Sequence, residues 1–139
     1  MKAAIRWTGG VSFSGRADSG HDVVMDGSPD YGGQNKGSRP MEVLLIGMGG
    51  CTAFDVIHIL RKQRQDVTDC VANIDAQRAE TDPKVFTKIH IRFIVTGRKL
   101  DPKKVDQAIH LSAEKYCSAS IMIGKTAEIT HDFELIEAT

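Results

Sequence analysis

Three cysteines are the residues of this 139-residue chain with the widest scope for covalent chemistry. Cys51 lies in the segment GGCTAFD, Cys117 lies in the segment EKYCSAS, and Cys70 stands apart between them. The thiolate form of cysteine is the nucleophile, and nearby positive charge or a helix N-terminus increases its population. No cysteine has a second ligand at the short spacing of a zinc site, so the sequence predicts neither a metal nor another cofactor.

The surroundings of Cys51 allow two interpretations. Gly49 and Gly50 each weaken a helix by about 1 kcal/mol relative to alanine, so we expect them either to permit close backbone packing or to break the helix just before Cys51. A break would place Cys51 at the start of a new helical segment. Free N–H groups and the helix dipole would then favour its thiolate. Taken alone, however, Cys51 also fits a small buried residue inside an apolar helix, which is a common role of cysteine.

Cys117 falls where a predicted helix ends, near an expected kink of the backbone. Taken alone, it too fits a core residue. Two cysteines near the ends of separate helical segments can form a disulfide if their Cα atoms come within about 7 Å. Cys70 lies near the start of a predicted strand without the charged helical surroundings of a reactive thiol, so we expect a structural role for it.

Two charged residues could assist a thiol. Arg16 follows Gly15 at the end of a predicted strand, where it could lower a thiolate pKa or bind a peroxide oxygen. The alternative for Arg16 is an exposed arginine at a strand end. Glu42 falls in the first turn of a predicted helix, where it could orient Arg16 or complement the helix dipole. The remaining candidates are scattered without the spacing of a triad or a metal site: His58, His90, His110 and His131.

The elements that must position these residues follow from hydrophobic periodicity and turn signals. The pattern predicts a three-stranded meander and a loop, a long helix, two strands, a second helix and a last strand; their residues are 3–8, 11–14, 21–25, 26–39, 40–63, 71–80, 86–97, 101–117 and 127–135. The long helix is apolar nearly all round, which predicts burial on every side by a sheet or by a partner chain. Glu42, Asp55 and His58 interrupt it, so its apolar stretch is shorter than the roughly 20 residues of a membrane span.

Composition indicates a single domain over residues 1–139 in the cytoplasm. The 18 basic and 18 acidic residues balance, which argues against a nucleic-acid partner, because phosphate binding requires concentrated positive charge. The first residues lack the apolar run of a secretory signal, and the cysteines are few, odd in number and widely spaced. In a reducing compartment, a disulfide is usually catalytic or redox-sensing.

Two segments resemble those of a known family. The segment SRPMEVLLIGMGGC, residues 38–51, resembles the Pro-Glu-x-Leu…Cys helix of the OsmC/Ohr family of osmotically inducible and organic hydroperoxide resistance proteins. Residues 116–120, YCSAS, resemble its second-cysteine segment, and the order of elements is similar over nearly the whole chain. The sequence looks most like the bacterial OsmC-like branch of unassigned function. The resemblance implies an α+β fold with an N-terminal meander, a long buried central helix, an antiparallel sheet and an intertwined homodimer.

The resemblance also implies a function. It makes Cys51 the peroxidatic and Cys117 the resolving cysteine of an organic hydroperoxide peroxidase. Arg16 falls near the position of the family's activating arginine, and Glu42 falls one residue after the position of the family's glutamate. The Cys51 sulfenic acid would condense with Cys117 to a disulfide, which a cellular dithiol, in the best-known members a lipoylated protein, would reduce. The alternative is a non-catalytic OsmC-like protein that senses redox state or binds a small ligand.

The sequence departs from the family pattern at three positions. Met41 follows Pro40, so Glu42 comes one residue late, which turns it by about 100° on a helix. Ser118 replaces the proline that follows the second cysteine, and Glu114 replaces a histidine three residues before it. We therefore expect both thiols to be in place but the Arg16–Glu42 network to be altered.

Overall fold

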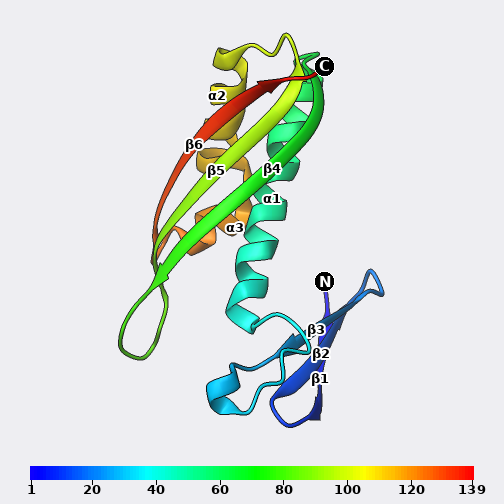
Figure 1. Cartoon of the computed structure of the whole chain (residues 1–139), viewed down its shortest axis with the longest axis vertical. Helices are drawn as coiled ribbons and strands as arrows, with labels where there is room; N and C mark the ends of the chain where they lie inside the picture. The colour runs from blue at the N-terminus through cyan, green and yellow to red at the C-terminus, as the bar shows by residue number, and fades with distance from the viewer. The chain divides into compact units, whose positions relative to one another are not determined.

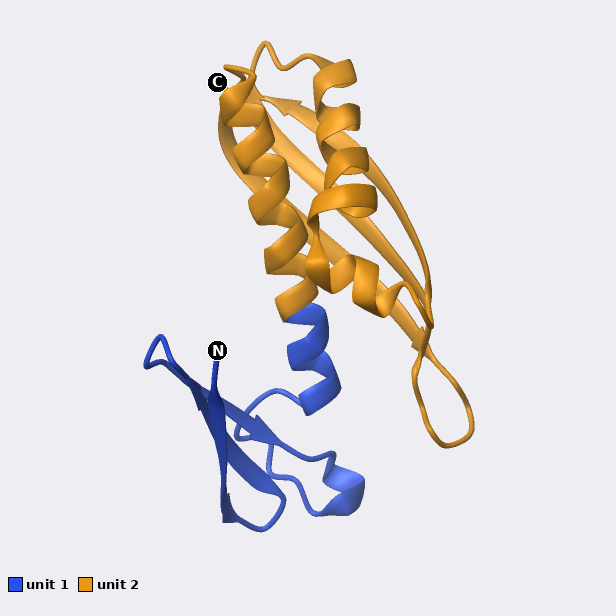
Figure 2. Ribbon diagram, turned by 180° about the vertical axis from the view of Figure 1, so that it is seen from behind, with its two compact units in different colours: residues 1–46 blue, residues 47–139 orange.

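The structure, a computed structural model that describes Met1–Thr139, contains two three-stranded sheets and one long helix. The chain divides into unit 1, Met1–Ile46, and unit 2, Gly47–Thr139 (Figure 2). The boundary falls inside helix α1, Pro40–Lys62. The predicted α+β class is therefore confirmed, and each unit is described on its own below.

Unit 1 contains the predicted antiparallel meander. Its strands are β1 (Ala3–Gly9), β2 (Ser12–Ala17) and β3 (Asp22–Asp26). The register pairs Trp7 with Phe13 and Ile5 with Gly15, which places apolar side chains on one face of the sheet. Trp7 is 65% exposed and Ile5 is 61% exposed. This apolar face therefore has no cover within unit 1.

A buried carboxylate organises the loop after β3. Asp26 is only 1% exposed, and its carboxylate accepts the backbone N–H groups of Gln34 at 2.9 Å and Lys36 at 3.1 Å. These two bonds hold the pKa of Asp26 below its ordinary value. The loop, which includes the short helix η1 (Pro29–Tyr31), is therefore anchored to the end of the sheet. The sequence predicted the loop but not its anchor.

Helix α1 begins with a capping interaction and continues without a break. The Glu42 carboxylate accepts the backbone N–H of Arg39 at 2.8 Å, as in the capping box of helix N-termini. The helix then runs through all its glycines to Lys62, so the predicted break before Cys51 is wrong. Close packing explains one of these glycines, because a Cβ on Gly49 would lie 2.9 Å from Cδ1 of Ile74 in strand β4.

Burial of α1 is one-sided within this chain. Met48, Val56 and Leu60 are fully buried, whereas Leu44 and Ile46 are largely exposed and Phe54 is 69% exposed. The sheet of the single chain therefore covers one face of the helix, and burial of the other face by a partner chain stays a prediction. By length and composition α1 could cross a membrane, a criterion that the core helix of a soluble protein also meets.

Unit 2 is a three-stranded sheet with helices on one face, as Figures 1 and 2 show from opposite sides. Its further elements are β4 (Asp66–Arg78), β5 (Phe86–Arg98), α2 (Pro102–Leu111), η2 (Ser112–Tyr116), α3 (Ser118–Ile123) and β6 (Glu128–Glu137). The central strand β5 turns Ile89, Ile91, Phe93 and Val95 into the core, as its alternation predicts.

The direction of β6 corrects the predicted sheet. Strand β4 pairs antiparallel with β5, as expected, but β6 pairs parallel with β5, so the predicted antiparallel sheet is a mixed one. The chain between β5 and β6 passes through α2, η2 and α3. Two parallel neighbouring strands require a crossover connection of this kind, because the chain must return to the end of the sheet at which the first strand began.

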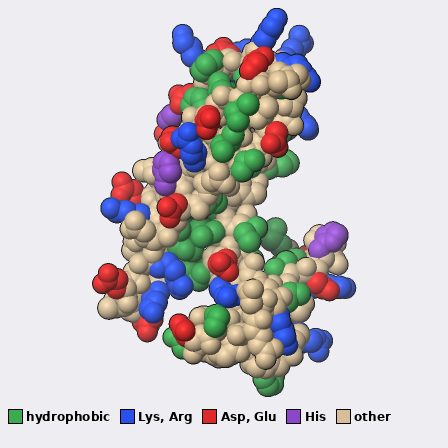
Figure 3. Space-filling model, viewed as in Figure 1, with side chains coloured by type: hydrophobic (Ala, Val, Ile, Leu, Met, Phe, Trp, Pro, Cys, Tyr) green, Lys and Arg blue, Asp and Glu red, His purple; other side chains and the backbone are tan.

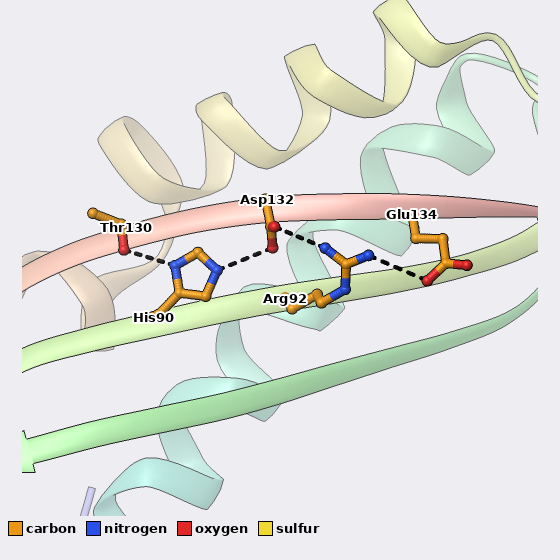
Figure 4. A network of polar contacts seen from close by, with 5 residues as sticks. All are labelled: His90, Arg92, Thr130, Asp132 and Glu134. Atoms are coloured by element: carbon orange, nitrogen blue, oxygen red, sulfur yellow. Dashed lines mark hydrogen bonds and ion pairs between the residues drawn. The ribbon is translucent and has the colours of Figure 1, made fainter.

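The outer face of this sheet is polar and carries a chain of bonded side chains. His90 contacts the Thr130 hydroxyl at 2.7 Å and the Asp132 carboxylate at 3.0 Å; Arg92 donates to Asp132 at 2.7 Å and to Glu134 at 3.2 Å (Figure 4). Charged and histidine side chains are interspersed with hydrophobic ones over this face (Figure 3). The network links β5 to its parallel neighbour, where cross-strand pairs stabilise the sheet.

Candidate active site

The structure brings Cys51 and Cys117 together within unit 2. Cys51 is half-buried in the middle of α1, and Cys117 is fully buried between η2 and α3. The two thiols are close enough that Cys51 raises the pKa of the Cys117 thiol, and both thiols are free. Because α1 is continuous, Cys51 does not lie at a helix N-terminus. The expected support of its thiolate by a helix dipole is therefore wrong.

A change of helix type places Cys117. Helix α2 starts at the predicted cap, Asp101, whose carboxylate accepts the N–H of Lys103 at 3.0 Å. It then widens into the π-helix η2, in which the N–H of Cys117 donates to the carbonyl of Ser112 at 2.8 Å. Single π-turns inside helices are frequent at functional sites. The predicted kink at Cys117 is confirmed.

The same π-turn corrects a second expectation. The helical spacing of Val105, Ala108, Ile109 and Ser112 predicts that Tyr116 continues their packed stripe, but its side chain is 51% exposed. A π-turn contains more residues than an α-turn, so each residue beyond it is rotated away from the stripe that α-helical spacing predicts. The rotation turns Tyr116 outward and Cys117 inward.

The environment of Cys117 keeps its thiol protonated at neutral pH. Burial raises the pKa of the Cys117 thiol, and the neighbouring Cys51 raises it further. The hydroxyl and backbone N–H of Ser120 act in the opposite direction; the N–H donates to Cys117 Sγ at 3.3 Å. Ser120 is a site residue that the sequence analysis missed, although its position three residues after a cysteine at a helix start is a detectable signal.

A buried hydroxyl network lies next to the two thiols. The Ser112 hydroxyl is fully buried and lies 2.8 Å from Oγ1 of Thr52 and 3.1 Å from the Asp55 carboxylate. Thr52 directly follows Cys51, and Asp55 lies one helical turn beyond it. In the sequence, Asp55 stands out only as a charged residue that interrupts an apolar helix. A polar residue at such a position commonly has a buried hydrogen-bond partner.

Arg16 and Glu42 both lie in unit 1, but they do not pair with each other. The Arg16 guanidinium donates to both oxygens of Asp22, at 2.7 and 3.1 Å, and this bidentate contact lowers the pKa of the Asp22 carboxyl. Glu42 caps α1 through Arg39. The Arg16–Glu42 contact, one of the two roles considered for Glu42, is therefore absent in this chain, and a role for either residue at the thiols stays a prediction.

Cys70 lies in the interior of strand β4 and is half-buried. Burial and the adjacent Asp69 raise the pKa of its thiol. Both effects disfavour the thiolate, in keeping with the expected structural role of Cys70. This makes Cys70 a suitable internal control for the chemistry of the other two cysteines.

A cavity of about 440 Å³ lies along α1 and begins at Asp55, one helical turn beyond Cys51; neither thiol lines it. Its lining combines a carboxylate, an ammonium group and aromatic and aliphatic surface: Asp55, His58, Ile59, Lys62, Gln63, Leu111 and Tyr116. Asp55 links the two features, because its carboxylate accepts the Ser112 hydroxyl and also lines the cavity. A small organic molecule fits a space of this size.

Comparison with known proteins gives consistent matches along the chain. The family model described as OsmC-like protein matches residues 33–132. Protein YhfA of Escherichia coli (strain K12) is 45% identical over 138 residues, covering 99% of this chain and 100% of that protein. The crystal structure of a hypothetical protein from Aquifex aeolicus VF5 is 30% identical, with a TM-score of 0.87 over 99% of this chain and 97% of that one.

One structure with a functional name is also similar. The organic hydroperoxide resistance protein OsmC from Legionella pneumophila has a TM-score of 0.70 over 96% of this chain and 95% of that one. Its sequence is 15% identical to this chain. At that identity the similarity concerns the fold, and it assigns no activity here.

Proposed function

Because the chain belongs to the OsmC-like protein family, we propose that it is a thiol-dependent peroxidase that reduces organic hydroperoxides through Cys51 and Cys117. The observation that carries this proposal is the meeting of the two thiols, one half-buried on α1 and one fully buried at the η2–α3 junction. A partly accessible thiol next to a sealed one suits a first thiol that meets the substrate and a second that resolves the product.

The first step takes place at Cys51. Its thiolate attacks the terminal oxygen of a hydroperoxide, ROOH, so that an S–O bond forms and the O–O bond breaks. The alkoxide leaves with one proton as the alcohol ROH, and Cys51 becomes a sulfenic acid. The peroxide is reduced by two electrons, which Cys51 supplies.

The second step consumes the thiol of Cys117. Its sulfur attacks the sulfur of the Cys51 sulfenic acid, the S–OH bond breaks, and the leaving hydroxide takes the Cys117 proton to form water. Because Cys117 is a protonated thiol at rest, that proton is available where it is needed. A dithiol, proposed to be a lipoylated protein in the cell, then returns two electrons and two protons by thiol–disulfide exchange.

The cavity beside Asp55 and Tyr116 supplies room for the organic group of the substrate. It begins one helical turn from Cys51 on α1 and has aliphatic and aromatic walls. We propose that an alkyl or aryl group binds there, which favours organic hydroperoxides over hydrogen peroxide, since hydrogen peroxide has no apolar group to bury.

We further propose that the working protein is a cytoplasmic homodimer. Two apolar surfaces lack cover in the single chain, namely the unit 1 face that carries Trp7 and the exposed residues Leu44, Ile46 and Phe54 of α1. Exposed apolar surface of this kind typically marks a protein–protein interface. Light scattering should give twice the 15.2 kDa of one chain, and a mass of one chain would contradict this part of the proposal.

A non-catalytic redox sensor is the second candidate, and a specific observation favours it. Glu42 caps helix α1 and Arg16 is bonded to Asp22, so the Arg16–Glu42 contact that the family resemblance implies is absent within this chain. A thiol pair that forms its disulfide without sustained turnover would report oxidation rather than remove peroxide.

Peroxide consumption distinguishes the two candidates. We expect the wild-type protein to consume cumene and t-butyl hydroperoxide catalytically with a dithiol reductant, and Cys51→Ser to abolish turnover. Without added reductant, Cys117→Ser should consume one peroxide per chain and retain a Cys51 sulfenic acid that no resolving thiol converts to a disulfide, while the control Cys70→Ser should keep full activity. A wild-type protein that forms the disulfide without sustained turnover would support the sensor instead.

A further inference from the structure

We infer that Ser112 is a positioning residue that holds Cys117 in register with Cys51 for disulfide formation. This inference rests on the proposed thiol chemistry and deepens it, because it names the group that aligns the resolving cysteine. Ser112 is not itself placed against the reacting sulfur atoms. It acts through its neighbours on two elements that are far apart in the sequence, α1 and η2.

The side chain of Ser112 fixes one half of this alignment. Its hydroxyl lies 2.8 Å from Thr52 Oγ1 and 3.3 Å from the Thr52 carbonyl oxygen, and Thr52 is the residue directly after Cys51. The same hydroxyl donates to the Asp55 carboxylate at 3.1 Å. Hydrogen bonds to charged groups are stronger than neutral ones, so Asp55 fixes the hydroxyl against the turn of α1 that begins at Cys51.

The backbone of Ser112 fixes the other half. Its carbonyl accepts the N–H of Cys117 at 2.8 Å across the π-turn. Ser112 therefore bonds through its side chain to the turn after Cys51 and through its backbone to Cys117. Ser112 is fully buried, so water does not replace the hydrogen bonds of its hydroxyl when the side chain is shortened, whereas the backbone bond to Cys117 remains.

Disulfide formation is sensitive to such a link. The bond requires an S–S distance near 2.05 Å and Cα atoms about 4.4–6.8 Å apart, with restricted torsion angles. A shift of η2 along α1 by a fraction of a turn would move Cys117 out of that range. The link from Cys51 to Cys117 through Thr52 and Ser112 resists this shift in the reduced protein, before any covalent bond forms.

The test measures the equilibrium between the protein dithiol and oxidised dithiothreitol in the full-length protein. In this exchange the protein loses two electrons and two protons to form the Cys51–Cys117 disulfide, and dithiothreitol gains them. We expect Ser112→Ala to lower the equilibrium constant for disulfide formation about tenfold, the factor that corresponds to one ordinary hydrogen bond. Ser118→Ala, an exposed neighbour of Cys117, should leave it unchanged.

A second readout separates positioning from general loosening of the fold. The alkylation rate of Cys51 in Ser112→Ala should stay within about twofold of wild type, because Cys51 lies on the intact helix α1. Thr52→Val removes the same 2.8 Å contact from the Thr52 side and should also lower the equilibrium constant for disulfide formation. Thr52→Ser keeps the hydroxyl and should give the wild-type constant. Thr52→Val carries the test if Ser112→Ala does not fold.

The outcomes distinguish this inference from the proposed function. A wild-type protein that forms no Cys51–Cys117 disulfide overturns both. A wild-type protein that forms it readily, with Ser112→Ala and Thr52→Val giving the same constant, overturns the positioning role alone. A purely structural Ser112 would destabilise the dithiol and disulfide forms equally, so that it also predicts an unchanged constant.

Discussion

Gly49 allows the close approach of helix α1 to strand β4 to be tested quantitatively. A Cβ at this position would lie 2.9 Å from Cδ1 of Ile74, which is closer than side chains tolerate without movement. Alanine also raises helix propensity by about 1 kcal/mol relative to glycine. The two effects oppose each other, so the measured change in stability depends on how far the Ile74 methyl group can move.

The magnitude follows from these two effects. Overpacking of a core costs about 1–3 kcal/mol, so Gly49→Ala should destabilise by about 0–2 kcal/mol after the gain in helix propensity. Ile74→Val removes the Cδ1 atom and by itself costs about 0.5–1.5 kcal/mol. In that background Gly49→Ala should be stabilising by about 1 kcal/mol, because the contact no longer exists. The predicted coupling between the two sites is therefore about 1–3 kcal/mol.

Urea denaturation of the four proteins of this double-mutant cycle gives the coupling directly. Gly47→Ala is the matched control, since its Cβ would meet nothing within 4 Å in this chain, and it should show no coupling to Ile74→Val. A coupling below about 0.5 kcal/mol at Gly49, the level found for independent sites, would refute the argument that helix–strand packing selects glycine there.

Three further predictions concern the titratable groups. The pKa of Asp26 is held low by the N–H groups of Gln34 and Lys36, so the contribution of Asp26 to stability is present above the unfolded carboxyl pKa of about 3.9 and is lost as pH falls through the folded pKa. Asp26→Asn should therefore reduce the fall of the unfolding free energy at acid pH and should expose the loop to trypsin at Lys36. The same acid dependence in both proteins would contradict this. Ser120 lowers the pKa of the Cys117 thiol, so Ser120→Ala should move the alkylation profile of Cys117 to higher pH in a background without the other two cysteines, whereas a fixed midpoint would show that the contact is unimportant. Burial and His110 lower the pKa of His131, so at pH values below the ordinary histidine pKa of about 6.5 the unfolded chain binds more protons than the folded one, and the free energy of unfolding should rise with pH there. His131→Asn should reduce this slope between pH 5 and 7, as measured by thermal unfolding at several pH values. The same slope in both proteins would exclude His131 as its source.

Several elements follow from local sequence because their physical causes are local. Strand β5 alternates apolar and polar residues, and Ile89 and Phe93 face the core as that period requires. Asp101 followed by Pro102 marks the start of α2 through capping and a fixed backbone angle. The kink at Cys117 was likewise predicted from the end of a helical pattern.

Other features depend on contacts between distant segments and are not encoded in any short window. The glycines of α1 suggested a break, but the helix continues, because the approach of Ile74 on a strand 25 residues later in the chain gives Gly49 a packing role. The Thr52–Ser112–Asp55 network joins residues about 60 positions apart, so periodicity shows each polar residue but not its partner. The parallel direction of β6 depends on the path of the crossover rather than on the composition of the strand.

The uncovered face of unit 1 gives the molecule a built-in optical reporter. Trp7 is the only tryptophan of the chain, and its indole lies on that face with 65% exposure, donating one hydrogen bond to the carbonyl of Gly10. The tryptophan fluorescence of the protein therefore comes from one surface alone. A monomer should emit at the long wavelength of a hydrated indole at every protein concentration. A dimer that covers this face should emit at shorter wavelength, and dilution should return the emission to that of the monomer.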